Sequence, residues 1–191
     1  MPDEEKLSSY LSKSKLISNS NYAKKIRIAI LGGFTLNGLE ETMRVKCDEK
    51  KIQCTTYVSG YNQYNQEILD EKSQLYKFSP DITFLIIDSR NVFGELFLNP
   101  YSISVEERKR FIQNKSDEII NLAKTLVKKS KSKLILSNFS MPSYSPIGIN
   151  ETREEFGLYD MVGNLNQNIK IGLRLEPEIF IYDLNSFVTK F

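Results

Sequence analysis

Ile28-Ala29-Ile30-Leu31-Gly32-Gly33-Phe34-Thr35-Leu36-Asn37 begins as an apolar, β-branched run and then reaches two adjacent glycines. Such a run is typical of a strand buried on both faces of a parallel sheet, and we expect this strand to span residues 26–31. Two glycines permit a sharp turn and let backbone N–H groups approach a ligand closely. The stretch matches neither the Gly-x-Gly-x-x-Gly pattern of dinucleotide-binding loops nor the Gly-Lys-Ser/Thr ending of P-loops. Thr35 or Asn37 could cap the next helix, and the sequence leaves open whether the loop also contacts a ligand.

Strand and helix patterns alternate along the rest of the chain. The strands are expected at residues 26–31, 52–58, 82–87, 134–136 and 179–182, and the helices at 36–50, 62–69, 104–129 and 156–174. Two helix starts carry a capping-box pattern, Ser104 to Glu107 and Thr152 to Glu155. The alternation predicts a doubly wound, flavodoxin-like α/β fold with a five-stranded parallel sheet in the order 2-1-3-4-5.

The first 25 residues differ in character from the rest. They are rich in Ser, Lys and Asn, and Leu7, Leu11 and Leu16 give at most a weakly amphipathic helix. We therefore expect an N-terminal appendage or linker helix over residues 1–25 and one α/β domain over residues 26–191. No helical pattern follows the last predicted strand, as would fit a chain cut at a domain boundary.

The composition argues against several classes of protein. Lys and Arg total 26 against 24 Asp and Glu, so the chain is nearly neutral and no nucleic-acid surface is expected. Residues 1–25 lack the apolar core of a signal peptide, and no apolar run reaches the ~20 residues of a membrane helix. A cytoplasmic location without membrane contact is therefore expected. Cys47 and Cys54 form no Cys-x-x-Cys pair and are expected to be reduced thiols, and neither a metal nor a cofactor is predicted.

The chain contains no histidine. Because imidazole is the usual general base near neutral pH, a Ser-His-Asp or Cys-His hydrolase cannot be assembled from these residues. We therefore assign no catalytic residue. An enzyme would need Thr35 or a serine as nucleophile, or a carboxylate such as Asp88 or Asp183 with a raised pKa.

Binding residues are expected outside the carboxyl ends of the strands, near the switch between the first and third strands. The candidates in the loops there are Gly33, Thr35, Asn37, Ser89, Arg90, Asn91 and Asn138. Arg90 could anchor a carboxylate or phosphate, or it could pair with Asp88. Asn138 could donate to a carbonyl oxygen or close its own loop.

Three segments resemble the N-terminal domain of FkbH-like proteins. They are Lys25 to Thr35, Tyr61 to Asp81, and Ile181 to Val188, so the resemblance extends over residues 25–191. It implies an SGNH-hydrolase-like three-layer sandwich that precedes a phosphatase domain of the haloacid-dehalogenase type (HAD-IIIC). It also implies a part in moving a glyceryl unit derived from phosphoglycerate onto an acyl-carrier protein.

The chain departs from the SGNH pattern at each catalytic block. Gly32-Gly33-Phe34 stands where the Gly-Asp-Ser turn would carry the nucleophile, and Arg90 stands where the third block has asparagine. Asp183 has no histidine after it, and the Asp-x-Asp motif of the phosphatase domain is missing. The resemblance therefore implies a non-hydrolytic domain that recognises a carrier-bound glyceryl or acyl group, a small phosphorylated or acyl ligand, or the acyl-carrier protein itself.

Two other functions remain open at the level of sequence. One is an active acyl-ester hydrolase or transferase that uses Thr35 or a carboxylate. The other is a scaffolding module, which would present a large apolar patch away from the strand ends.

Overall fold

The computed structural model describes residues 6–17 and 22–188, and its strands form one parallel sheet. The strands are β1 (Lys24–Gly32), β2 (Ile52–Val58), β3 (Ile82–Ile86), β4 (Lys133–Ser137) and β5 (Ile179–Tyr182). Their order is β2-β1-β3-β4-β5, and every neighbouring pair is parallel. The predicted fold class and strand order are therefore confirmed.

The helices connect these strands and also precede the first one. They are α1 (Leu7–Leu16), α2 (Leu39–Glu49), α3 (Tyr64–Leu69), α4 (Gln74–Phe78), α5 (Ser89–Phe93), α6 (Val105–Ser130), α7 (Leu158–Leu173) and α8 (Leu184–Val188). Short 3-10 segments occupy Gly94–Phe97, Pro100–Ser102 and Gly148–Arg153. None of the helices within the described residues is both long and apolar enough to cross a membrane.

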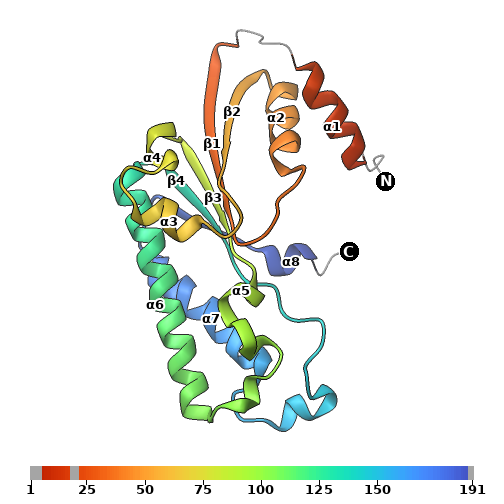
Figure 1. The fold of residues 1–191 in the computed structure, drawn as a ribbon, viewed down its shortest axis with the longest axis vertical. Coiled ribbons are helices and arrows are strands. Elements are labelled where there is room, and N and C mark those ends of the chain that lie inside the picture. The colour runs from red at the N-terminus through yellow and green to blue at the C-terminus, as the bar shows by residue number, and fades with distance from the viewer. Residues whose placement is uncertain (1–5, 18–21, 189–191) are drawn as a thin grey trace.

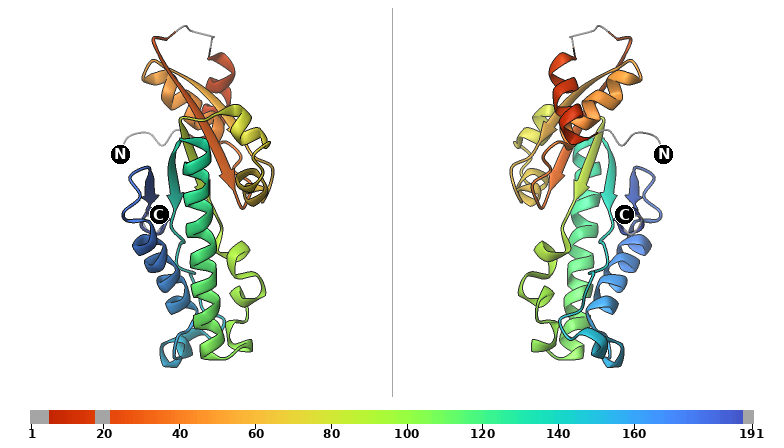
Figure 2. Two further views of the ribbon diagram at one scale, coloured as in Figure 1. Left: turned by 90° about the vertical axis from the view of Figure 1, so that its left-hand side faces the viewer. Right: turned by 90° about the vertical axis from the view of Figure 1, so that its right-hand side faces the viewer.

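The helices lie in layers on the two sides of the sheet (Figure 1). On one side are α3, α4, α6 and α7, and on the other are α2 and, outside it, α1 (Figure 2). Beyond the sheet, α6 and α7 continue side by side and make the molecule elongated.

The main core lies under the α6 and α7 layer. Leu85 of β3 and Leu134 and Leu136 of β4 are fully buried there, and Ile112 and Leu126 of α6 belong to the same buried cluster. Burial of this apolar surface is the largest favourable contribution to folding, which explains why the alternating pattern predicted these elements well.

The opposite face of β3, β4 and β5 is covered less completely. Phe84, Ile86 and Ile135 line an apolar groove of about 380 Å³, which Phe34 also borders. Phe180 of β5, on the same face as Ile135, is 50% exposed. Parallel sheets usually bury both faces, so the layer on the α2 side is incomplete over these strands.

The C-terminal part of the chain differs from the sequence prediction in two places. The Thr152 to Glu155 capping box is wrong, because Gly148–Arg153 is a 3-10 segment and α7 begins at Leu158. There the Gly157 N–H donates to the Asp160 carboxylate at 3.1 Å. The expectation that no helix follows the last strand is also wrong, since α8 follows β5 directly.

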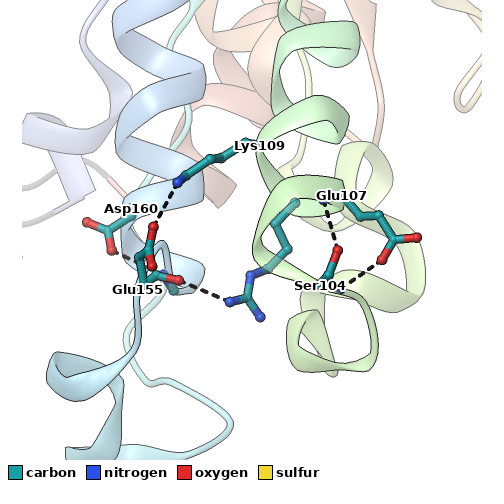
Figure 3. Close-up of polar contacts among 7 residues, drawn as sticks. Ser104, Glu107, Lys109, Glu155 and Asp160 are labelled. Carbon is teal, nitrogen blue, oxygen red and sulfur yellow. Dashed lines mark hydrogen bonds and ion pairs between the residues drawn. The ribbon is translucent and has the colours of Figure 1, made fainter.

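The start of α6 confirms the other capping box (Figure 3). The Ser104 hydroxyl accepts the Glu107 N–H at 3.3 Å, and the Glu107 carboxylate accepts the Ser104 N–H at 2.8 Å. The bond from the Ser104 backbone N–H to the carboxylate lowers the pKa of Glu107, because it favours the charged form. One turn further on, Lys109 forms an ion pair with Glu155 at 2.8 Å, which joins α6 to the segment before α7.

A buried carboxylate holds the loop before α7 to the same end of α6. Glu151, 5% exposed, accepts the hydroxyls of Tyr101 and Ser145, and the Tyr159 N–H at 3.0 Å. Burial alone would raise the pKa of Glu151, but these hydrogen bonds outweigh it and hold the pKa below its ordinary value of 4.5. The guanidinium of the buried Arg108 lies 5.1 Å from the Tyr101 ring centroid. The cluster is therefore built around an ionised Glu151.

We expect Glu151→Gln to lower the free energy of unfolding by about 2 kcal/mol near pH 7, because a buried charged acceptor of three hydrogen bonds is lost. Since the pKa of Glu151 is lowered on folding, its contribution is complete above pH 4.5 and is lost as the pH falls through the lowered value. The difference between the two proteins should therefore shrink in acid. Urea unfolding between pH 3 and 7 measures it, with the exposed Glu154→Gln as the control. A constant difference over that range would contradict the assigned role.

Candidate functional site

The loops after β1, β2 and β3 converge at one end of the sheet. The Gly33 N–H donates to the Ile86 carbonyl of β3 at 2.9 Å, and the Asn62 N–H donates to the Gly32 carbonyl at 3.2 Å. The Ser59 N–H donates to the Ile30 carbonyl at 3.0 Å. These bonds fix the turn after β1 between the two neighbouring loops, at the topological switch point where the sequence predicted a site.

Gly33 and Asn91 meet at this point. The Asn91 side chain donates to the Gly33 carbonyl, and a Cβ on Gly33 would lie 2.9 Å from Asn91 Nδ2 and 3.3 Å from the Asp88 nitrogen. The second glycine is therefore required by the close approach of the β3 loop. Its φ is not positive, so left-handed backbone geometry is not the reason.

The Asp88 carboxylate bonds to the backbone of Arg90, two residues further on. The Asp88 carboxylate accepts the Arg90 N–H at 2.7 Å and caps α5. The Arg90 guanidinium lies 5.5 Å from the centroid of the Phe97 ring and is exposed. Ser89 is the first residue of α5, beside them. Arg90 therefore lies on the rim of this end of the sheet.

A cleft of about 480 Å³ opens at the carboxyl ends of β1 and β2. Thr35 and Asn37 line it from the β1 loop, and Ser59 and Tyr61 line it from the β2 loop. Hydroxyl and amide groups from two loops thus face one space, an arrangement that can bind a polar, hydrogen-bonding ligand. Thr35 and Asn37 are the two predicted site residues that the structure brings into this cleft.

Asn138 has a different place. Its amide donates to the Asp183 carboxylate at 2.8 Å, and its carbonyl oxygen accepts the Asn185 N–H at 3.0 Å. Asp183 in turn accepts the Ser186 N–H at 3.0 Å. Asn138 and Asp183 therefore fasten the start of α8 to the end of β4, and neither lines the cleft at β1 and β2.

Sequence reasoning missed the residues that give the cleft its acidic and apolar sides. Glu40 and Glu41, in the first turn of α2, give it an acidic side, and Leu7 and Leu11 of α1 give it an apolar side. Glu40 also accepts the Thr56 hydroxyl of β2 at 2.6 Å. Two acidic residues right after a glycine-rich turn were a signal for the acidic side, whereas the leucines of α1 gave no indication of what they contact.

Cys54 lacks the properties of a nucleophile. Cys47 of α2 and Cys54 of β2 are free and half-buried. Burial, followed by the nearby Cys47, raises the pKa of Cys54 to about 12, so the thiol stays protonated at neutral pH. Within residues 6–17 and 22–188, no three Cys, Asp or Glu side chains gather in a way that could hold a metal ion.

Comparison with families and solved structures agrees with this geometry. The model of the FkbH N-terminal domain matches residues 27–191. No curated protein sequence matches the chain.

Two solved structures illustrate the likeness. The N-terminal part of BF1531 from Bacteroides fragilis, which contains a phosphatase domain and was crystallised with Mg, is 17% identical with a TM-score of 0.79. That match covers 97% of this chain and 47% of the other, so the chain spans about half the length of that structure. A candidate GDSL-like lipase from Parabacteroides merdae is 15% identical with a TM-score of 0.50, covering 81% of this chain and 75% of the other. These likenesses establish an SGNH-like fold.

We expect Gly33→Ala to lower the free energy of unfolding by about 1–3 kcal/mol, because the methyl group would force apart the packed loops after β1 and β3. Gly163→Ala is the matched control. It lies in the exposed middle of α7 with no atom within 4 Å of the new methyl group. It should raise stability by about 0.5–1 kcal/mol. Equal effects of the two substitutions in urea unfolding would refute the close approach at Gly33.

Proposed function

Because the chain belongs to the FkbH N-terminal domain family, we propose that it binds an acyl or glyceryl group presented as a thioester and does not hydrolyse it. The observation that carries the proposal is the cleft at β1 and β2, lined by Thr35 and Asn37, in a chain without histidine.

The absence of hydrolysis follows from the residues at the turn. Hydrolysis of a thioester at neutral pH usually needs an activated nucleophile and a general base. The residue at the position of the SGNH nucleophile is Phe34, whose ring can neither attack a carbonyl nor move a proton. Thr35 lies in the cleft, but no imidazole exists in the chain to take its proton.

The charge of the cleft favours an uncharged ligand over a phosphorylated one. Glu40 and Glu41 face the same space as Thr35 and Asn37. Two carboxylates beside a phosphate would repel it, and removing the phosphate from water would add to the cost. A neutral thioester with hydroxyl or carbonyl oxygens can instead accept hydrogen bonds from the Thr35 hydroxyl and the Asn37 amide.

The partners that we propose for this protein are those that the family implies. A carrier protein would present the thioester, and a phosphatase domain would lie in another part of a longer protein. In support, this chain matches only about half of the Bacteroides structure, which contains a phosphatase domain.

A scaffolding role is the second candidate, and the apolar groove over β3 and β4 favours it. Phe180 and Tyr182 of β5 are 50% and 43% exposed beside that groove. An apolar surface of this kind often marks an interface with another protein.

Glyceryl and acetyl thioesters of N-acetylcysteamine test the proposal by isothermal titration calorimetry. We expect both to bind, 3-phosphoglycerate to bind more weakly, and no thiol to be released. Thr35→Val and Asn37→Ala should each weaken binding about fivefold, as expected for one lost hydrogen bond. Asn150→Ala, at an exposed position in the 3-10 segment before α7, is the control.

Other outcomes would identify the alternatives. Release of thiol that is lost in Thr35→Val would show an active transferase or hydrolase and contradict the proposal. No binding by the wild-type chain, together with self-association that Phe180→Ser abolishes, would favour the scaffolding module.

A further inference from the structure

Helix α1 lies outside residues 27–191, which the family model matches, yet it contributes to the cleft. It packs along α2, on the side of α2 that faces away from the sheet (Figure 1). Leu7 and Leu11, one turn apart on α1, line the same space as Thr35 and Asn37. The cleft therefore has one wall that comes from a separate part of the chain.

Two contacts hold α1 in this place. Leu7 packs so closely against Gly38 that a Cβ on Gly38 would collide with the leucine methyl group. Gly38 has a φ of +85° and precedes α2, so glycine is favoured here by its backbone as well as by the contact. One turn further along α1, the Lys46 ammonium of α2 lies 5.1 Å from the centroid of the Tyr10 ring. Both contacts fix α1 on α2 beside the turn after β1.

The wall contributed by α1 differs in chemistry from the rest of the cleft. Leu7 and Leu11 are 51% and 37% exposed, although α1 is packed on α2. Apolar side chains that stay accessible inside a polar cleft favour a ligand that covers them with hydrocarbon. The hydrogen-bonding groups of Thr35 and Asn37 lie across the same space.

We propose that α1 is part of the binding site and that Leu7 and Leu11 bind an apolar segment of the ligand. The ligand is then amphiphilic: its hydrogen-bonding group contacts the β1 loop, and its hydrocarbon chain contacts α1. This deepens the proposed function, on which it rests, by selecting a short acyl chain over a glyceryl unit as the group that the cleft binds best.

Straight-chain alcohols test this inference without using any thioester, so it can fail or succeed separately from the proposed function. The assay uses Thr35→Cys in a Cys47→Ser/Cys54→Ser background and measures the rate of reaction with N-ethylmaleimide. Alcohols from butanol to octanol are added as protecting ligands. Leu7→Asp/Leu11→Asp removes the apolar wall, and Ser12→Asp, which adds one negative charge at an exposed position of α1, is the control.

We expect protection to strengthen with each methylene of the alcohol, by up to about fourfold in apparent affinity. In the Leu7→Asp/Leu11→Asp protein the alcohols should give no protection at any chain length, because the hydrocarbon contact is gone, whereas the Ser12→Asp protein should keep the protection and its dependence on chain length. Thermal unfolding followed by circular dichroism checks that each variant is folded. If the double variant is not, Leu11→Asn takes its place.

Two results would overturn the inference. One is protection that does not depend on the length of the alcohol. The other is equal protection by the alcohols in the leucine variant and in Ser12→Asp, which would mean that Leu7 and Leu11 do not contact the bound hydrocarbon.

Discussion

Strand β1 pairs with β2 along one edge and with β3 along the other, and its carboxyl end has to leave the sheet between the loops of both neighbours. Gly32 and Gly33 make this exit possible. The Gly33 N–H is tied to β3 and its carbonyl accepts the Asn91 amide, so there is no room for a side chain. The cleft beside Thr35 and Asn37 exists because the chain must turn there and then start α2. The helix layers, the switch point and the candidate site all depend on this glycine turn after β1.

Most of the fold could be predicted from the sequence, because burial imposes regular patterns. The strands at 52–58 and 179–182 have the predicted bounds, and the Ser104 capping box sets the start of α6. The capping box predicted at Thr152 is wrong although its sequence fits the local pattern. The buried Glu151 beside it holds that segment in a 3-10 turn. A contact between residues 101, 145 and 151 has no local signature, so sequence patterns could not reveal it.

The candidate site was predicted less well, for a related reason. A loop can be assigned to the end of a strand, but the direction of its side chains depends on partners far away in the chain. The sequence allowed Asn138 to donate to a ligand or to close its own loop, and its side chain instead bonds to Asp183 and Asn185, more than forty residues later. Leu7 and Leu11 were predicted to belong to an N-terminal appendage. They line the cleft from α1, which packs on α2. Thr35 and Asn37 could be placed at the end of β1 because the turn that carries them is itself a local feature, and they line the cleft.

Helix α6 extends well past the sheet that it covers. Its 26 residues span about 39 Å, whereas β3 and β4, with five residues each, span only about 17 Å. The end of α6 that projects beyond the strands packs against α7 and the loop around Glu151, without any backbone pairing to the sheet. The projecting end of α6, with the part of α7 packed on it, can therefore open while the strands stay paired. Its amide protons should exchange with solvent through a local opening of lower free energy than global unfolding. The molecule then contains two cooperative units within one continuous core.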